Sequence, residues 1–173
     1  SNGIRIGEDK SFCNGHLPVW KDLGLTAIYI TVHDVDEKKN AEVYGVKIYP
    51  PLELVLSRIH DADLLMRANL VLGKKTIGTL NRFVSTIERL RKIGVDFISA
   101  WPIRSWDDKV DEELSPLEEE LDKICIDICK ESSAKGVIDD DSCPEYYPHP
   151  KGPSEDHREY HSKRQHIRRW GHH

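Results

Sequence analysis

Two polar residues interrupt an apolar run near the middle of the chain. Arg67 and Asn69 lie within the strand-like residues 64–72, and side chains two residues apart in a strand point to the same face. A charged side chain is costly to bury in such a run unless it is paired. Arg67 could hold a carboxylate through its planar guanidinium group, and Asn69 could both donate and accept hydrogen bonds. We favour a ligand-binding role, and the alternative is an ion pair with a neighbouring strand.

Polar residues also end the predicted strand at residues 26–33. Thr31, His33 and Asp34 lie at its carboxyl end, and Asp36 follows closely. In parallel α/β folds, ligands bind at the carboxyl ends of strands. The alternative for Asp34 and Asp36 is that a carboxylate caps the next helix by accepting backbone N–H groups. We favour the capping role for Asp36. For His33 we leave open whether it binds a ligand or has only a structural role.

A third predicted strand, residues 94–101, ends in a further group of side chains. Ser99 and Trp101 lie near its carboxyl end, and Arg104 follows Pro102 in the next loop. This position makes them candidates for the same ligand site. Trp101 fits a packing role equally well.

Two sets of potential metal ligands are not interpreted as metal sites. His157 and His161 are four residues apart, so both rings would share one helical face, as zinc ligands can. No closely spaced pair of cysteines accompanies them, and a solvated tail is the favoured interpretation. Cys125 and Cys129 belong to a predicted helix at residues 115–135, where a free cysteine commonly packs as a small apolar side chain. We therefore assign no metal site.

Helical patterns separate the three strands. Apolar residues recur at helical spacing in two segments (Leu52, Val55, Leu56, Ile59; Leu80, Phe83, Val84, Ile87, Leu90). Gly94 is expected to end the second helix, and Ser115 is expected to be the N-cap of the helix at residues 115–135. Residues 3–6 and 136–138 are further short strand candidates. Alternating strands and helices predict an α/β fold with a parallel sheet, either doubly wound or an arc of a βα barrel.

The composition divides the chain into a folded part and a tail. The 173 residues include 25 Lys and Arg, 30 Asp and Glu, and nine His, six of which fall between His149 and His173. Residues 151–173 carry a net charge of +3 and residues 1–150 a net charge of −8. The tail has too few aliphatic residues to offset its chain entropy. We expect a folded domain at residues 1–141 and a flexible, polar, His-rich tail at residues 142–173.

The composition also limits location and partners. No apolar stretch approaches the roughly 20 residues that span a bilayer, and early charges exclude a signal segment. Four cysteines in a chain of this length do not indicate a disulfide framework, so a cytoplasmic location is expected. A charge of +3 over the tail is too small to favour nucleic-acid binding.

Four segments in order resemble the radical S-adenosylmethionine (radical SAM) superfamily. Ser1-Asn2-Gly3 resembles the [ST]-N-G that ends the third barrel strand in many members, and residues 30–45 resemble the fourth strand and its loop. Residues 67–71 resemble the R-x-N-x-V of the fifth strand, and residues 97–104 resemble the sixth. The similarity covers roughly residues 1–138 and is carried by the order and spacing of these pieces. The C-x3-C-x2-C loop that binds the family's [4Fe-4S] cluster does not occur in this chain.

The resemblance implies the later half of a partial βα barrel that binds S-adenosylmethionine (SAM). Residues that could contact the cofactor or substrate are then Thr31, His33, Arg67, Asn69 and Trp101. The chain would be a fragment, a split subunit or a degenerate copy, inactive alone and acting on an unknown substrate. Its open sheet edges favour a missing N-terminal half or self-association. The alternative is a non-catalytic α/β module that binds a small molecule or a protein partner.

Overall fold

A computed structural model describes residues 1–134 of the chain, and the side chains as far as residue 127. This part is an α/β fold built on a three-stranded parallel sheet of order β1-β2-β3. The strands are Ala27–Val32 (β1), Leu65–Leu72 (β2) and Phe97–Pro102 (β3). All three predicted strands are confirmed. They form because runs of β-branched and apolar residues suit a sheet that is buried on at least one face.

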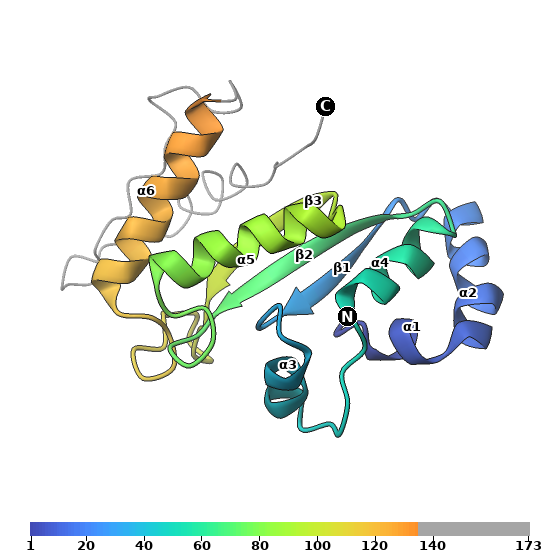
Figure 1. Cartoon of the computed structure of the whole chain (residues 1–173), viewed down its shortest axis with the longest axis horizontal. Coiled ribbons are helices and arrows are strands. Elements are labelled where there is room, and N and C mark those ends of the chain that lie inside the picture. The colour runs from blue at the N-terminus through green and yellow to red at the C-terminus, as the bar shows by residue number, and fades with distance from the viewer. Residues whose placement is uncertain (135–173) are drawn as a thin grey trace.

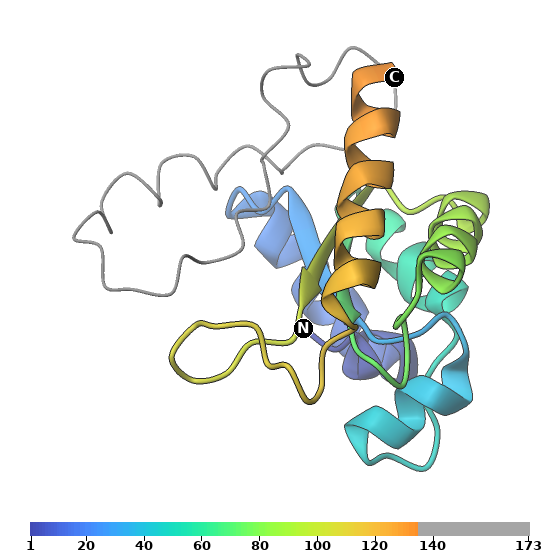
Figure 2. The same cartoon turned by 90° about the vertical axis from the view of Figure 1, so that its left-hand side faces the viewer.

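Six helices flank the sheet in the described part. They are α1 (Ile4–Glu8), α2 (Lys10–Asp22), α3 (Glu37–Tyr44), α4 (Leu52–His60), α5 (Leu80–Ile93) and α6 (Glu118–Ala134). Helices α4 and α5 lie to one side of the strands, whereas the loop that follows β3 extends to the other side (Figures 1 and 2). None of the described helices is long and apolar enough to cross a membrane.

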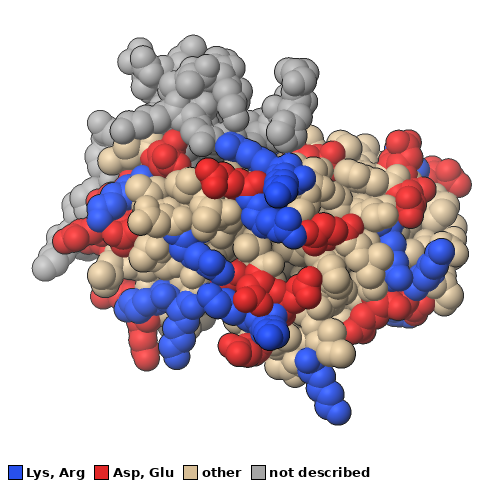
Figure 3. Space-filling model, viewed as in Figure 1, with Lys and Arg blue, Asp and Glu red and all other residues tan. Residues whose placement is uncertain are grey.

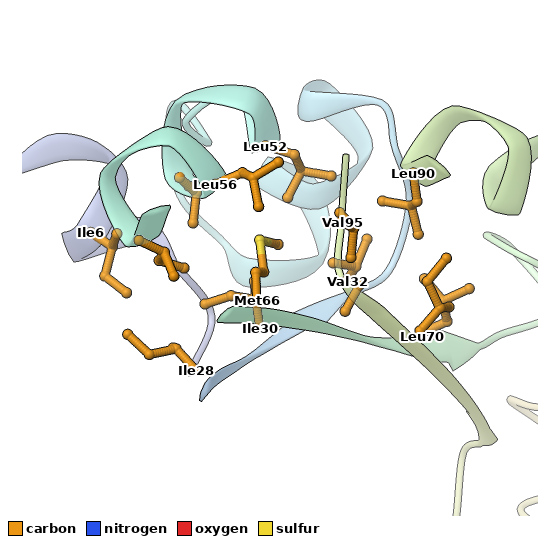
Figure 4. Close-up of a cluster of buried hydrophobic side chains, with 14 of the residues drawn as sticks. Ile6, Ile28, Ile30, Val32, Leu52, Leu56, Met66, Leu70, Leu90 and Val95 are labelled. Carbon is orange, nitrogen blue, oxygen red and sulfur yellow. The ribbon is translucent and has the colours of Figure 1, made fainter. Parts of the chain in front are cut away.

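The hydrophobic core lies between the sheet and these helices. Even-numbered strand residues such as Ile30 and Leu70 point toward α1, α4 and α5, where they meet Leu56 and Leu90 (Figure 4). All four apolar residues of the predicted stripe on α4 are buried. Because side chains alternate in a strand, the even-numbered side chains face the core and the odd-numbered side chains lie on the opposite face of the sheet.

Both ends of α5 are capped. Thr79 caps the first turn by accepting a hydrogen bond from the Arg82 N–H. Gly94 ends the helix with φ of 90°, a left-handed conformation that costs glycine little. The predicted C-cap is therefore confirmed.

Two local expectations were wrong. Residues 3–6 do not form a strand, because α1 begins at Ile4; the chain instead pairs with β1 through Ser1. Ser115 is not an N-cap, since α6 begins at Glu118 and the buried Ser115 hydroxyl donates to the Ile103 carbonyl. For Ser115, a hydrogen bond to a residue twelve positions away replaces the expected local cap.

Candidate functional site

The sheet face opposite the core carries polar and aromatic side chains in register. Its members come from odd-numbered positions of the three strands: Tyr29, Thr31, Arg67, Asn69, Val71, Phe97, Ser99 and Trp101. We call this surface the open face. Tyr29 is 49% exposed and Trp101 is 38% exposed, while the even-numbered neighbours are almost all buried. A parallel sheet normally has both faces covered by apolar layers, so this mixed polar and aromatic face is the candidate binding surface.

The first row across the open face places one cation between two aromatic rings. Tyr29, Arg67 and Phe97 are direct neighbours on the three strands. The Arg67 guanidinium carbon lies 4.9 Å from the centroid of the Tyr29 ring and 5.6 Å from that of the Phe97 ring. Such cation–π contacts hold a guanidinium in place without neutralising its charge. The guanidinium also donates to the Tyr29 hydroxyl at 3.4 Å, so the row fixes the orientation of the Arg67 side chain.

The second row supplies hydrogen-bonding groups. Thr31, Asn69 and Ser99 are paired across the strands, one step nearer the carboxyl ends. The Ser99 hydroxyl donates to the side-chain oxygen of Asn69. The amide nitrogen of Asn69 then has no hydrogen-bond partner among the described residues and can donate to a ligand. Arg67 and Asn69 thus share one face of β2, as the alternation predicted, and Thr31 is the neighbour of Asn69 on β1.

His33 lies just beyond the end of β1, beside the second row. Its ring packs edge-on against Tyr44 of α3, with the ring centroids 5.1 Å apart. The Tyr44 hydroxyl donates to the Thr31 carbonyl at 2.8 Å, which fixes this aromatic pair at the strand end. Burial lowers the pKa of His33 below its usual range and raises that of Tyr44 to about 12. Both groups are therefore neutral at pH 7.

We expect nuclear magnetic resonance to find the His33 imidazole neutral at pH 7. A titration of the ring nitrogen shifts should give a pKa below the ordinary value of about 6.5, because burial penalises the charged ring. The His33→Gln variant identifies the signal by its loss. A measured pKa at or above 6.5 contradicts the half-buried position of the ring.

The neighbouring carboxylates have structural roles. Asp34 is fully buried on the core side of the sheet and pairs with Arg82 of α5, at 2.5 Å, so it is not part of the open face. The sequence did not predict this pairing across 48 residues. Asp36 is the N-cap of α3, where its carboxylate accepts the Lys38 N–H at 2.8 Å. The capping role predicted for Asp36 is confirmed.

Of the two candidate residues at the end of β3, only Trp101 lies on the open face. Trp101 lies on the open face opposite Val71, so it is available to a ligand near the carboxyl edge. Arg104 is held in the loop after β3, where its guanidinium donates to the carboxylate of Asp108 at 2.9 Å and to its carbonyl at 3.0 Å. Arg104 therefore stabilises this loop and does not join the two rows.

Sequence reasoning did not identify Tyr29 and Phe97 as site residues. Each is the in-register neighbour of Arg67 and exposes part of its ring on the open face. The available signal was the alternation of β1, in which Tyr29 lies two residues before Thr31. Their register with Arg67 could not be read from one sequence, because strand pairing is non-local.

The described residues hold no group of three His, Cys, Asp or Glu side chains that could bind a metal ion. The Cys13 thiol donates to the Ile6 carbonyl in the core, and Cys125 is half-buried on α6. Cys125 thus has the packing role expected for it. The Cys129 side chain, Cys143 and the His157 and His161 pair lie outside the described side chains.

The charges on the helix-covered face are mixed. Basic and acidic side chains alternate across it, without a continuous basic area (Figure 3). This distribution gives no support to a nucleic-acid interface there. In comparisons with known proteins, no family model and no curated protein matches this sequence.

Proposed function

We propose that this chain supplies the SAM-binding part of a radical SAM βα barrel. It is then a fragment, a split subunit or a degenerate copy of such an enzyme. The observation that carries the proposal is the open face, where an oriented guanidinium and a row of hydrogen-bonding groups lie on the side of the parallel sheet opposite the core. In a βα barrel the helices cover the outer face of the sheet and the other face lines the interior, which matches the position of the open face opposite the helix-covered side.

The residues of the open face fit SAM by their chemistry. The Arg67 guanidinium suits the carboxylate of the methionyl group, since a planar fork binds a carboxylate through two hydrogen bonds. Asn69 and Thr31 can hydrogen-bond the ribose or the amino group. Trp101 offers a ring on which adenine can stack, and His33 in its neutral form can accept a hydrogen bond. In this superfamily SAM is the source of a 5′-deoxyadenosyl radical that removes a hydrogen atom from the substrate.

The iron–sulfur cluster of that superfamily does not fit the described residues. The described cysteines, Cys13 and Cys125, belong to different helices, α2 and α6, and neither joins a group of potential metal ligands. A [4Fe-4S] cluster needs several converging thiolates. We therefore assign no reaction step to this chain, and its role is to bind and orient the cofactor.

SAM binding is tested by thermal unfolding of the full chain. We expect SAM to raise the melting temperature, because a ligand at 100 times its Kd stabilises the folded state by about 2.7 kcal/mol. Arg67→Ala and Asn69→Ala should each weaken binding by about tenfold or more, since a hydrogen bond to a charged group contributes roughly 1.5–3 kcal/mol. The expected order of affinity is wild type, Arg67→Lys, then Arg67→Ala, because lysine keeps the charge but loses the planar fork.

Leu65→Ala is the matched control. Leu65 begins β2 and is 41% exposed, but it lies two residues before Arg67, at the amino end of the strand. This variant should keep the SAM response of the wild type. If SAM produces no shift in the wild-type protein, SAM binding is rejected and a non-catalytic module that binds another partner becomes the better description.

A further inference from the structure

Three aromatic rings connect the carboxyl end of β1 to the hydrophobic core. The His33 ring packs edge-on against Tyr44, and the Tyr44 ring stacks on that of Tyr49, with the centroids 5.6 Å apart and the ring planes 10° apart. His33 and Tyr44 are half-buried, whereas Tyr49 is 1% exposed. Stacked and edge-on arrangements are those that aromatic pairs prefer. The place of His33 therefore depends on a ring that is itself held against the core.

Each tyrosine hydroxyl in this column of rings has a backbone partner. The Tyr44 hydroxyl donates to the Thr31 carbonyl and the Tyr49 hydroxyl donates to the Asn2 carbonyl, both at 2.8 Å. Burial raises the pKa of both hydroxyls, that of Tyr44 to about 12, so both remain protonated donors at neutral pH. Each ring is therefore fixed by a hydrogen bond as well as by packing, since a buried polar group without a partner is costly.

The two ends of α3 fix where Tyr44 lies. The helix begins after the Asp36 cap, beyond the end of β1 in Figure 1, and Tyr44 is its last residue. Gly45 then ends the helix with φ of 64°, a left-handed conformation that suits glycine. The helix thus brings Tyr44 back to Thr31, which lies 13 positions earlier in the chain. This contact closes the segment that carries Thr31 and His33.

We propose that Tyr44 is a positioning residue for the ligand site. Its hydroxyl holds the backbone of Thr31 at one end of the second row, and its ring holds the imidazole of His33 beside that row. Phenylalanine would fill the same space without the hydrogen bond, so the hydroxyl has a role that packing alone does not require. The proposal rests on the proposed function only for the identity of the ligand, SAM, because the contacts join residues of this chain.

Two variants of the full chain separate the ring from the hydroxyl. Tyr44→Leu removes the ring that packs on His33, so we expect the His33 pKa, measured by nuclear magnetic resonance without SAM, to rise toward the ordinary value of about 6.5. Tyr44→Phe keeps the ring and should leave the His33 pKa unchanged. It should weaken SAM binding by about threefold or more, because the Thr31 backbone loses one hydrogen bond.

A double-mutant cycle shows whether the Tyr44 ring acts through His33. Tyr44→Leu should weaken SAM binding less in the His33→Gln background than in the wild-type background, since residues that act together are not additive. Val43→Ala is the control, because Val43 lies on the same helix and is 46% exposed. This variant should change neither the His33 pKa nor SAM affinity.

Two results would overturn the positioning role. One is the same His33 pKa in Tyr44→Leu and wild type, which means that the imidazole does not depend on the Tyr44 ring. The other is an equal loss of SAM affinity in both backgrounds of the cycle, which assigns the effect to general destabilisation. If Tyr44→Leu does not fold, unchanged SAM affinity in Tyr44→Phe rejects the role of the hydroxyl. If SAM does not bind the wild type, the proposed function fails, while the His33 pKa in Tyr44→Leu still decides the positioning of His33.

Discussion

Asn40→Ala is expected to lower the free energy of unfolding by about 3–5 kcal/mol, because it leaves three buried backbone groups without partners. The Asn40 side-chain oxygen accepts the N–H groups of His33 and Asp34 at 3.1 and 3.2 Å, and its amide nitrogen donates to the Asp34 carbonyl. Asn40 is itself fully buried, so water does not readily replace it. Equilibrium urea unfolding monitored by circular dichroism measures the change.

Asn81→Ala is the control for this variant. Asn81 is exposed on α5 and makes no side-chain hydrogen bond within the described part of the chain. Its replacement should change the free energy of unfolding by about 0.5 kcal/mol or less. A loss below about 1 kcal/mol for Asn40→Ala would show that the end of β1 is held by other contacts. Because His33 lies in this turn, SAM binding should weaken together with stability.

Asp34→Asn is expected to lower the free energy of unfolding by about 2–3 kcal/mol at pH 7, since removing one partner of a buried ion pair leaves the other uncompensated. The Arg82 side chain is 35% exposed, so the loss is smaller than for a fully buried pair. The carboxylate also accepts the Asp36 N–H at 2.9 Å and lies 3.5 Å from the Lys39 ammonium. The variant therefore loosens the contact between the β1–α3 turn and α5.

The effect of Asp34→Asn should depend on pH. Burial raises the pKa of Asp34, but the hydrogen bonds from Arg82 and the Asp36 N–H, with the charges of Arg82 and Lys39, outweigh burial and hold it below the ordinary value of 3.8. A lowered folded-state pKa gives stability that is present above pH 3.8 and is lost as the pH falls through the folded pKa. The difference between wild type and Asp34→Asn should therefore be full at pH 7 and shrink below pH 3.8.

Urea unfolding at several pH values measures this dependence. Asp61→Asn is the control, because Asp61 is exposed at the end of α4 and no salt bridge involves it in the described part of the chain. That variant should follow the wild-type pH profile. A constant difference between wild type and Asp34→Asn from pH 7 to pH 2.5 would mean that the ion pair contributes nothing to acid unfolding.

The elements that sequence reasoning found are those with strong local signals. The strands have continuous β-branched and apolar runs, and α4 and α5 have apolar residues at helical spacing, so each pattern is complete within one element. Helix α2 was not predicted, because Gly15 and Pro18 interrupt it and few of its residues are aliphatic. Its buried side, Cys13 and Leu17, is recognised only once it packs against the core.

The sequence by itself determined the α/β class, the three strands, the Asp36 cap, the Gly94 C-cap and the polar pair Arg67 and Asn69. These depend on alternation within a strand or on contacts a few residues apart, which leave a periodic pattern in the chain. Only the tertiary structure decided that Asp34 pairs with Arg82, that Tyr29 and Phe97 flank Arg67, and that Ser1 lies on the edge of β1. These contacts join residues about 30 to 50 positions apart, and the register that makes them is fixed by packing of the whole sheet against its helices.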